Sequence, residues 1–395
     1  MPSQTPRRML LRVAVAEILG MTLWFSATAA APQIVTEFAL DEGWRAWLTM
    51  AVQAGFVAGT LITALTNAAD AINARRLFAL GCLAGAACNA AIAGAPTAGA
   101  IVALRFCTGA SLAWVYPPAM KIAAGWFRER RGTALGVVVG AVGAGSAFPH
   151  LLAWLGSGLS WRLLVAASSV LAVAGAAIIA FGVADGPHVT ASSPFDRHAL
   201  RVVLRSRGTR LAMLGYFGHM WELYALWTWI AAFAAASLGA AAATGSAVAF
   251  VTISAGAIGC VVGGLWADRW GKAEVAGAAM LASAACALAS PAFYGAPLAV
   301  LLVLTVIWGF TVVADSAQFS ALVTEHTPRT HVGTALTLQT SAGFLLTMIS
   351  MRLVPPLVVL GGWKWAFLFL VPGPLLGAWA MKRLMAYDSG LTTAP

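Results

Sequence analysis

Charged residues are scarce in this chain of 395 residues. Only 10% are Asp, Glu, Lys or Arg, whereas 60% are hydrophobic, and the mean hydropathy is +0.83. A water-soluble chain of this length could not hide so much apolar surface in its cores. The shortage of charge therefore excludes an ordinary soluble domain and indicates an integral membrane protein.

Clusters of reactive side chains are also missing. The five cysteines all fall inside long apolar runs and the six histidines are scattered, so the sequence shows neither a disulfide framework nor a metal site. A nucleotide-binding loop of the form G-x-x-x-x-G-K-[ST] is missing as well, which argues against a built-in ATP motor. We therefore expect no metal and no cofactor. A polytopic membrane enzyme and a non-transporting sensor are remote alternatives.

Long apolar segments are what the chain has instead. A membrane-spanning helix needs about 20 mostly apolar residues. The first apolar segment sits between RRMLLR and SATAAAP and so imitates a cleavable secretory signal, but Glu17 within it and eleven further segments favour a retained helix. The sequence predicts an all-α membrane protein with spans at 10–32, 44–67, 76–93, 97–120, 132–154, 162–184, 210–236, 243–266, 273–290, 298–321, 332–352 and 364–382.

The net charge of +10 could suggest a nucleic-acid partner, but the positions of the basic residues indicate a membrane topology. With the N-terminus placed inside, eighteen of the 24 basic residues fall on that side, and the outside receives only Arg45, Arg162, Arg352 and Lys364. Basic residues are enriched in cytoplasmic loops. We therefore expect cytoplasmic termini, a location in the cell's inner (plasma) membrane, the lipid bilayer as a partner, and no nucleic acid.

The two halves of the chain repeat one another. A hydrophilic stretch at 185–210 divides the chain near its middle, and matching residues occur on either side at offsets of 198 to 203. Such a repeat indicates a six-helix unit used twice. We predict bundles at 1–184 and 210–395, joined by a cytoplasmic loop at 185–209. The matches are Leu23-Trp24 with Leu226-Trp227, Asp70 with Asp268, GTAL at 132 with GTAL at 333, and Trp161-Arg162 with Trp363-Lys364.

A charged joint interrupts the apolar runs at residues 264–272, which read GLWADRWGK, and a degenerate copy, TNAADAINARR, occupies 66–76. The joint resembles the loop signature of the major facilitator superfamily, and RFCTGASLA at 105–113 resembles that family's fourth-helix motif. The resemblance implies two pseudo-symmetric six-helix bundles, alternating access, and a central cavity lined by helices one, four, seven and ten. We expect a monomer whose two joints latch the bundles together, with Gly264 and Gly271 allowing a tight turn. The latch residues are Gly264, Asp268, Arg269, Gly271, Lys272, Asp70, Arg75 and Arg76.

The fifth predicted span carries glycines at 132, 136, 140 and 145. This pattern is similar to the family's antiporter motif, although Ala141 stands where the motif has proline. Small residues at this spacing also let helix backbones approach closely in lipid, whatever the protein does. The pattern therefore leaves both antiport and simple helix packing open.

Charged residues inside the spans carry the functional prediction, because each costs about 2.5 to 3.5 kcal/mol to insert unpaired. They lie on the first, fourth, seventh and tenth spans, the four that the resemblance assigns to the cavity. We expect Glu222, close to the membrane midplane, to carry a coupling proton, His219 to tune it, and Asp315 to be the competing carboxylate. Glu17 is a further candidate, although Glu17 and Arg105 could instead form a structural ion pair.

The same spans offer contacts for a solute. Arg105 and Lys121 favour an anionic substrate, although Lys121 could instead reach the lipid headgroups. Aromatic side chains could stack on an organic substrate or fill lipid-facing positions. We predict a proton-coupled secondary transporter of a small organic solute, with uptake of an organic anion favoured; the alternative is a proton-driven exporter of drugs or other hydrophobic or cationic compounds. The aromatic candidates are Trp24, Trp114, Tyr116, Trp221 and Trp308.

Overall fold

The computed structural model describes residues 5–41, 43–66, 71–127, 131–188 and 200–390, and within them every regular element is a helix. The first half of the chain forms α1 (Pro6–Ala29), α2 (Ala31–Glu37), α3 (Gly43–Leu65), α5 (Ala74–Ala91), the 3₁₀ turn η1 (Ile92–Gly94), α6 (Ala98–Leu112), α7 (Tyr116–Trp126), α8 (Arg131–Leu155) and α9 (Trp161–Gly182).

The second half begins with the short helix α10 and continues through the remaining long helices and two 3₁₀ turns. Its elements are α10 (Leu200–Arg205), α11 (Arg207–Leu238), α12 (Ala242–Trp270), α13 (Lys272–Phe293), α14 (Leu298–Ala314), α15 (Ser316–His326), η3 (Arg329–His331), α16 (Val332–Gly361), η4 (Leu368–Leu370) and α17 (Pro372–Asp388).

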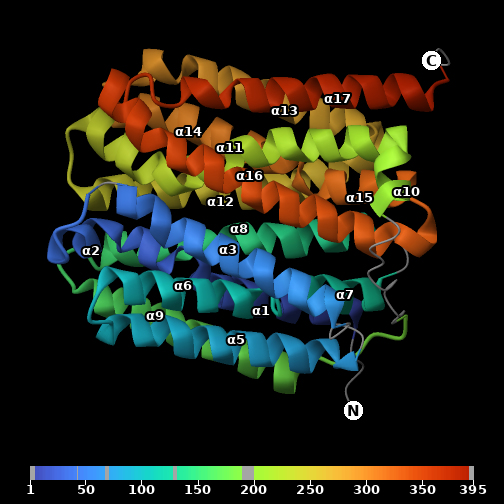
Figure 1. Ribbon diagram of the computed structural model, residues 1–395, viewed down its shortest axis with the longest axis horizontal. Helices are drawn as coiled ribbons and strands as arrows, with labels where there is room; N and C mark the ends of the chain where they lie inside the picture. The colour runs from blue at the N-terminus through green and yellow to red at the C-terminus, as the bar shows by residue number, and fades with distance from the viewer. Residues whose placement is uncertain (1–4, 42, 67–70, 128–130, 189–199, 391–395) are drawn as a thin grey trace.

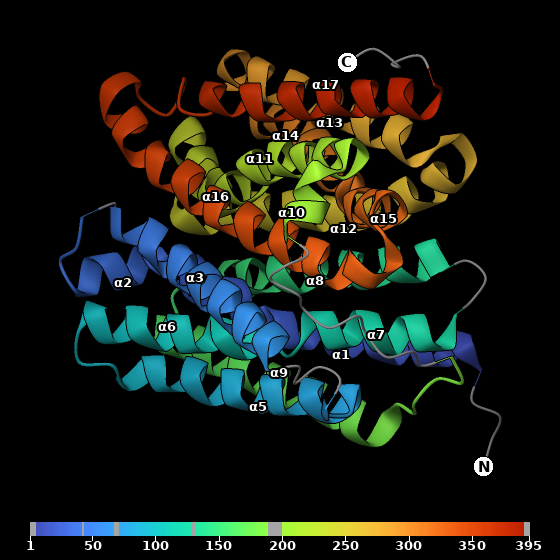
Figure 2. The same ribbon diagram turned by 45° about the vertical axis from the view of Figure 1, so that its right-hand side comes forward.

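The two halves form two helical bundles that lie side by side (Figure 1). Helices α3 and α8 of the first bundle pack against α16 and α12 of the second, and both views place these four helices at the interface (Figure 2). The start of α1 and the end of α17 lie at the same end of the molecule, here called the terminus end; α2 lies at the opposite end, here called the far end. Helices that start at the terminus end, such as α1 and α8, therefore run towards the far end.

Twelve membrane crossings account for this architecture, as predicted. Ten segments among the described residues are long and apolar enough to cross a membrane by length and composition. The two other crossings are α11, whose Trp, Tyr, His and Glu side chains lower its hydropathy, and α17, which has only 17 residues. Helices α11 and α17 pack against one another within the second bundle.

Three predicted spans differ in detail from the observed helices. The fourth is broken into α6 and α7 because Pro117 and Pro118 cannot donate the backbone hydrogen bonds that would continue the helix. The tenth is broken at Asp315, between α14 and α15. The twelfth, predicted at 364–382, begins only at Pro372, because residues 363–371 form turns; proline is favoured in the first turn of the helix that follows.

Close helix contacts repeat between the bundles. A Cβ atom on Gly109 of α6 would lie 1.9 Å from the backbone oxygen of Val52 on α3, and one on Gly309 of α14 would lie 1.9 Å from that of Thr252 on α12. Only glycine permits such an approach between helix backbones. These equivalent contacts, 200 residues apart in the chain, are the structural counterpart of the internal repeat.

Candidate functional site

A cavity of about 900 Å³ lies between the two bundles at the far end. The first bundle contributes Thr28 near the end of α1, Arg45 near the start of α3 and His150 near the end of α8. The second bundle contributes Thr228 on α11 and Arg352 on α16. Most of the remaining lining is Ala, Val, Leu, Pro and Trp. The cavity is therefore a largely apolar chamber with a few polar groups.

Aromatic rings from both bundles pack together deeper in the interface than this cavity. Trp24 lies one helical turn deeper than Thr28 on α1, and its ring centroid is 5.1 Å from that of Phe56, 5.8 Å from that of Tyr224 and 5.6 Å from that of Phe344. These rings come from α1, α3, α11 and α16. The cluster therefore joins the two bundles below the cavity.

Helices α8 and α12 are in contact from the middle of the bundle interface to its terminus end. A Cβ atom on Gly140 of α8 would lie 2.9 Å from the backbone oxygen of Ala257 on α12, so these helices touch at backbone distance. Further along, Thr133 Oγ1 donates a hydrogen bond of 3.4 Å to Asp268 Oδ2, and Asp268 Oδ1 approaches Gly132 in the first turn of α8. A carboxylate is favourable at a helix N-terminus. Asp268 thus connects the second bundle to the first.

The other residues of the second joint have different positions. Gly264 lies inside α12 rather than in a turn, because α12 continues to Trp270; the expectation of a turn there is wrong. Gly271 alone makes the sharp change of direction, with φ +101°. Lys272 donates a hydrogen bond of 2.7 Å to Glu325 within the second bundle, and Arg269 is exposed.

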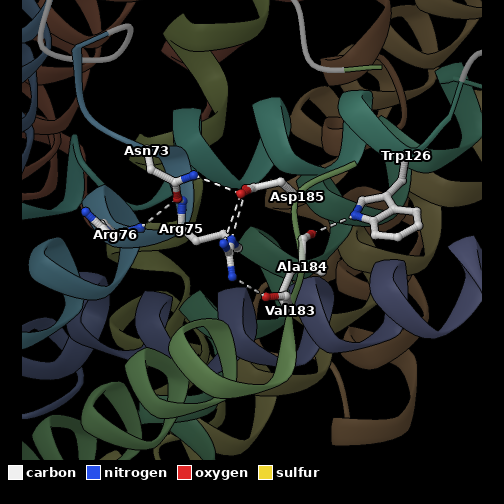
Figure 3. A network of polar contacts seen from close by, with 7 residues as sticks. All are labelled: Asn73, Arg75, Arg76, Trp126, Val183, Ala184 and Asp185. Atoms are coloured by element: carbon white, nitrogen blue, oxygen red, sulfur yellow. Dashed lines mark hydrogen bonds and ion pairs between the residues drawn. The ribbon is translucent and has the colours of Figure 1, made fainter. Parts of the chain in front are cut away.

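The first joint ties elements within its own bundle. Asp70 lies outside the described residues. Asn73 caps α5, and its side-chain amide donates to Asp185 Oδ2 at 3.0 Å. Arg75 donates hydrogen bonds from Nε and Nη2 to the same carboxylate, each at 2.9 Å, and from Nη1 to the Val183 carbonyl (Figure 3). Both Asp185 and Val183 follow α9, so Arg75 ties two elements of the first bundle here, and its function in a latch between the bundles stays a prediction.

Neighbouring contacts extend this tie across the terminus end of the first bundle. Trp126 Nε1 at the end of α7 donates to the Ala184 carbonyl at 2.9 Å (Figure 3). Arg76 is exposed, and its backbone N–H bonds to the Asn73 side chain at 3.4 Å. The Arg75 guanidinium lowers the pKa of Asp185 by stabilising the charged carboxylate. The segment that leaves α9 is therefore held against α5 and α7.

A comparable tie holds the far end of the first bundle. Arg162 at the start of α9 bonds both carboxylate oxygens of Glu37 at the end of α2, at 2.6 and 2.9 Å. Trp161 Nε1 donates to Glu37 as well, at 2.6 Å. These donors lower the pKa of Glu37 to about 2. The positive-inside argument identified Arg162 as an outer residue but gave no indication of its partner.

Arg105 is fully buried and bonded to its own bundle. Its Nε donates to the Leu48 carbonyl at 3.0 Å, its Nη1 to the Leu23 carbonyl at 2.7 Å, and its Nη2 to the Trp24 carbonyl. Ser26 and Asn89 complete its surroundings, and Asn89 continues the network to α9. Arg105 therefore joins helices α1, α3, α5 and α6, and its donors point at backbone oxygens rather than into the cavity.

Glu17 is the other predicted partner of Arg105, but the ion pair is not formed. Glu17 is fully buried in α1, and neither of its carboxyl oxygens has a hydrogen-bond partner in the described part of the chain. An unpaired ionised carboxylate is costly in the membrane interior, whereas a protonated one is tolerated. Its position stays compatible with the predicted proton role.

Glu222 lies in the interior of the second bundle. It is 1% exposed, Ser283 Oγ donates to its Oε2 at 2.8 Å, and Trp308 Nε1 donates to its Oε1 at 2.6 Å. The donors come from α13 and α14, so three helices meet at this side chain. Trp308 was predicted to touch substrate, but its indole N–H is bonded to Glu222.

His219 and Asp315 form the second buried polar centre of this bundle. His219 Nδ1 lies 2.8 Å from Asp315 Oδ1, close but not aligned for a linear hydrogen bond, and Ser316 Oγ lies 3.1 Å from His219 Nε2. Both side chains are 2% exposed. Asp315 is at the break between α14 and α15, which brings it beside α11. The structure therefore pairs His219 with Asp315 rather than with Glu222.

The remaining predicted substrate contacts lie away from the cavity. Trp114 donates to Thr63 Oγ1 at 2.9 Å in the first bundle, and Trp221 donates to the Phe369 carbonyl at 3.0 Å in the second. Tyr116 begins α7, and Lys121 is half-buried on the same helix. All seven predicted contacts are among the described residues and none of them lines the cavity. Their contact with substrate stays a prediction.

The cavity contains residues that the sequence pattern does not indicate as part of a site. His150 lies near the outer end of the span predicted at 132–154, and the distribution of basic residues places Arg45 and Arg352 only on the outer side. Because these residues are far apart along the chain, the sequence alone does not show that they meet in one cavity. Once the helix directions are known, the ends of α1, α8 and α16 and the starts of α3 and α12 must meet at the far end.

Comparisons with known proteins agree with the geometry. The family model described as Major Facilitator Superfamily matches this chain twice, over residues 13–211 and 212–390. A structure of the human organic anion transporter MFSD10 (TETRAN) superposes with a TM-score of 0.71, covering 96% of this chain and 100% of that one at 17% sequence identity. At this identity the likeness shows a common fold. No curated protein sequence matches.

Proposed function

Because this chain belongs to the major facilitator superfamily, we propose that it is a secondary active transporter that takes up a small organic anion together with protons by alternating access. The family and the fold support a membrane transporter rather than an enzyme. The substrate class, the proton coupling and the direction are the proposal. We place the terminus end in the cytoplasm and the far end outside, following the distribution of basic residues.

The position of the cavity carries the proposal. The chamber of about 900 Å³ lies between the bundles at the far end, whereas α8 and α12 touch at backbone distance in the middle of the interface and Asp268 of α12 contacts the first turn of α8 at the terminus end. A molecule with a cavity between two pseudo-symmetric bundles needs only to rock them to present that cavity to the other side. The arrangement corresponds to one of the two states that alternating access requires.

Two buried acidic centres in the second bundle support proton coupling. Glu222 and the His219–Asp315 pair lie on helices that also bound the cavity or pack against those that do. A carboxyl group in the membrane interior is more easily tolerated when protonated than when ionised. Protonation at either centre can therefore accompany a movement that changes its access to water.

The proposal is tested by flux in proteoliposomes with an imposed pH gradient. Pools of radiolabelled organic acids are supplied outside at lower pH than inside, and the proposal predicts accumulation that a protonophore abolishes. Empty liposomes control for passive entry of weak acids. Flux of a solute that ignores the pH gradient would remove the proton coupling, and specific binding without any flux would favour a sensor.

The exporter alternative has weaker support. It rested on the glycine pattern of α8, and those glycines have a packing function in the structure: Gly140 and Gly143 face Ala257 of α12, and Gly145 faces the Ile18 backbone of α1. Packing accounts for the pattern without antiport. Accumulation of an apolar cation inside inverted vesicles on acidification of their lumen would nevertheless favour export.

A further inference from the structure

His150 is a buried polar side chain without a hydrogen-bond partner on the wall of the cavity. It is 1% exposed, and neither ring nitrogen has a partner in the described part of the chain. Its ring lies beside Phe25, with 6.2 Å between the centroids, and it lines the chamber between the bundles. Buried polar groups are rarely left unbonded, because burial removes their hydrogen bonds to water. The geometry thus offers His150 a partner from within the cavity.

The charges around the cavity favour a negative partner. Arg45 from the first bundle and Arg352 from the second both line it, and Asp41 is the one acidic residue of the described lining. Arg352 extends across the bundle interface, since its Nη1 would lie 3.4 Å from a Cβ atom on Gly43. Opposite charges attract more strongly in a chamber with apolar walls than in water. An anion entering from the far end would pass these arginines first.

The rest of the lining favours an apolar body. The walls of the cavity consist mainly of Ala, Pro, Leu and Val side chains. On the side of the second bundle they include Trp229 and Trp363, whose ring centroids are 5.9 Å apart. The Trp229 indole N–H is already bonded to the Met351 carbonyl, so this ring offers an apolar face rather than a donor. Apolar walls with a few placed polar groups are the usual composition of a small-molecule site.

We propose that the cavity binds an amphipathic organic acid whose acidic group contacts His150, with Arg45 and Arg352 attracting it at the mouth. This inference rests on the proposed transport function and specifies its substrate class. It also moves the anion contact from Arg105, whose donors are directed at backbone oxygens, to a residue on α8 at the bundle interface. His150 then determines which end of the substrate enters first.

The test measures binding by the full-length protein in lipid nanodiscs. The probes are straight-chain carboxylates from butyrate to dodecanoate and phenyl-substituted ones from phenylacetate to phenylbutyrate, each compared with its primary amide. At least one acid is expected to bind, with its amide about tenfold weaker or more, since a hydrogen bond to a charged group contributes about 1.5 to 3 kcal/mol. Failure of every acid to bind, or equal binding of acid and amide, would overturn the inference.

Two variants assign the contact. His150→Gln is expected to weaken binding of the acid about tenfold or more, whereas the matched control His188→Gln, at the terminus end, leaves it unchanged. Arg352→Gln, on an exposed position, is expected to weaken binding severalfold at low salt and little at high salt, and it remains informative if His150→Gln proves aggregated in gel filtration. Wild-type affinity in a well-folded His150→Gln, or in Arg352→Gln at low salt, would contradict the proposal.

The outcomes also separate this inference from the proposed transport function. Flux without His150-dependent binding refutes this inference alone. His150-dependent binding without flux refutes the transport proposal.

Discussion

Glu222 and Asp315 occupy separate polar centres in the second bundle. Glu222 is held by Ser283 and Trp308, and Asp315 by His219. This separation lets the two acids be tested independently, which would be impossible if they shared one network. The sequence placed both acids inside spans of the second half, but of their helices only α11 contributes to the described lining of the cavity. It could not show their partners, because Ser283 is an ordinary small residue of an apolar helix and Trp308 is one of 16 tryptophans.

The first prediction concerns the coupling proton. Glu222→Gln is expected to abolish accumulation driven by a pH gradient while exchange of substrate across the membrane persists, because an amide cannot release a proton. Asp315→Asn should retain accumulation if Glu222 is the carrier. Counterflow and gradient-driven uptake are measured on the same proteoliposomes. Accumulation by both variants at the wild-type level would leave Glu17 as the remaining candidate.

Arg105 illustrates which partners of a buried charge a sequence cannot indicate. Its position inside a span suggested a substrate anion or an ion pair with Glu17, whereas its donors are directed at the carbonyls of Leu23, Trp24 and Leu48. Backbone oxygens are present at every residue, so no residue-type pattern could indicate them as partners. A buried arginine can be satisfied without any acid.

The second prediction follows from this arrangement. Arg105→Gln is expected to lower the unfolding free energy by at least about 2 kcal/mol, because several buried charged hydrogen bonds are lost together. The exposed Arg76→Gln serves as the matched control and should change little. Unfolding midpoints in one detergent are compared. An unchanged midpoint together with lost substrate binding would instead support the predicted substrate contact.

At the scale of elements, the two charged joints differ in what they connect. The second joint places Asp268 of α12 against the first turn of α8, across the bundle interface, whereas the first joint connects Arg75 of α5 to Asp185 within one bundle. The internal repeat indicated equivalent functions for both. Sequence similarity fixes the position of a joint along the helices, but the partner depends on which bundle lies opposite.

The third prediction concerns the joint that crosses the interface. Asp268→Asn is expected to slow flux several times while the unfolding midpoint stays unchanged, because the carboxylate at the start of α8 contributes about 0.3 to 1 kcal/mol to one of two nearly balanced states. Glu274→Gln changes an exposed acid of the same joint and is the control. Wild-type flux in Asp268→Asn would remove its predicted latch function.

The fourth prediction uses pH to test the tie within the first bundle. Arg75 lowers the folded-state pKa of Asp185 below its unfolded value near 3.9. The stabilisation is therefore fully present above that unfolded value and is lost as the pH falls through the lower folded value. Since Asp185 is 44% exposed, solvent screening limits the contribution to about 1 kcal/mol or less.

Wild-type protein and Asp185→Asn are compared over a pH series to measure this contribution. The difference between their unfolding midpoints should be constant from pH 8 to about 5 and should shrink below about 4. Glu37, with its pKa near 2, is present in both proteins and cancels in the difference. A difference that grows on acidification would show that Asp185 is not stabilised as an anion.

The helices themselves were largely predictable because length and hydropathy determine what can cross a membrane. The positions at which these helices break were less predictable. Pro117 and Pro118 signalled the end of α6, but the break at Asp315 has no proline or glycine beside it, and the late start of α17 depends on how residues 363–371 pack as turns. Tertiary packing decides such boundaries. The His219–Asp315 centre lies at such a break. The sequence therefore indicates its residues but not how they are placed relative to one another.

At the scale of the whole molecule, the proposed transport by alternating access requires two bundles that move as units. Each is internally tied, the first through Arg105, Arg75 and Arg162, and contacts between the bundles are concentrated on α3, α8, α12 and α16. Strong ties within each unit and small residues between them are what a rocking movement requires. The cavity and its arginines would then be exposed alternately to the two sides.

The most direct measurement is of distances between spin labels at the two ends of the interface. In a cysteine-free background, one pair joins Thr66→Cys and Thr330→Cys at the terminus end, and another joins Thr36→Cys and Leu360→Cys at the far end; all four positions are exposed. A third pair, Thr66→Cys with Ser157→Cys, lies within the first bundle and reports whether that bundle stays rigid.

Distance distributions are recorded by pulsed electron paramagnetic resonance in nanodiscs at pH 8 and at pH 5.5. Because protonation of the buried acids is expected to shift the balance of states, a second population should grow in which the terminus-end pair lengthens as the far-end pair shortens, while the pair within the first bundle stays constant. Changes of the same sign at both ends, or a single population at each end under both conditions, would contradict alternating access driven by protons.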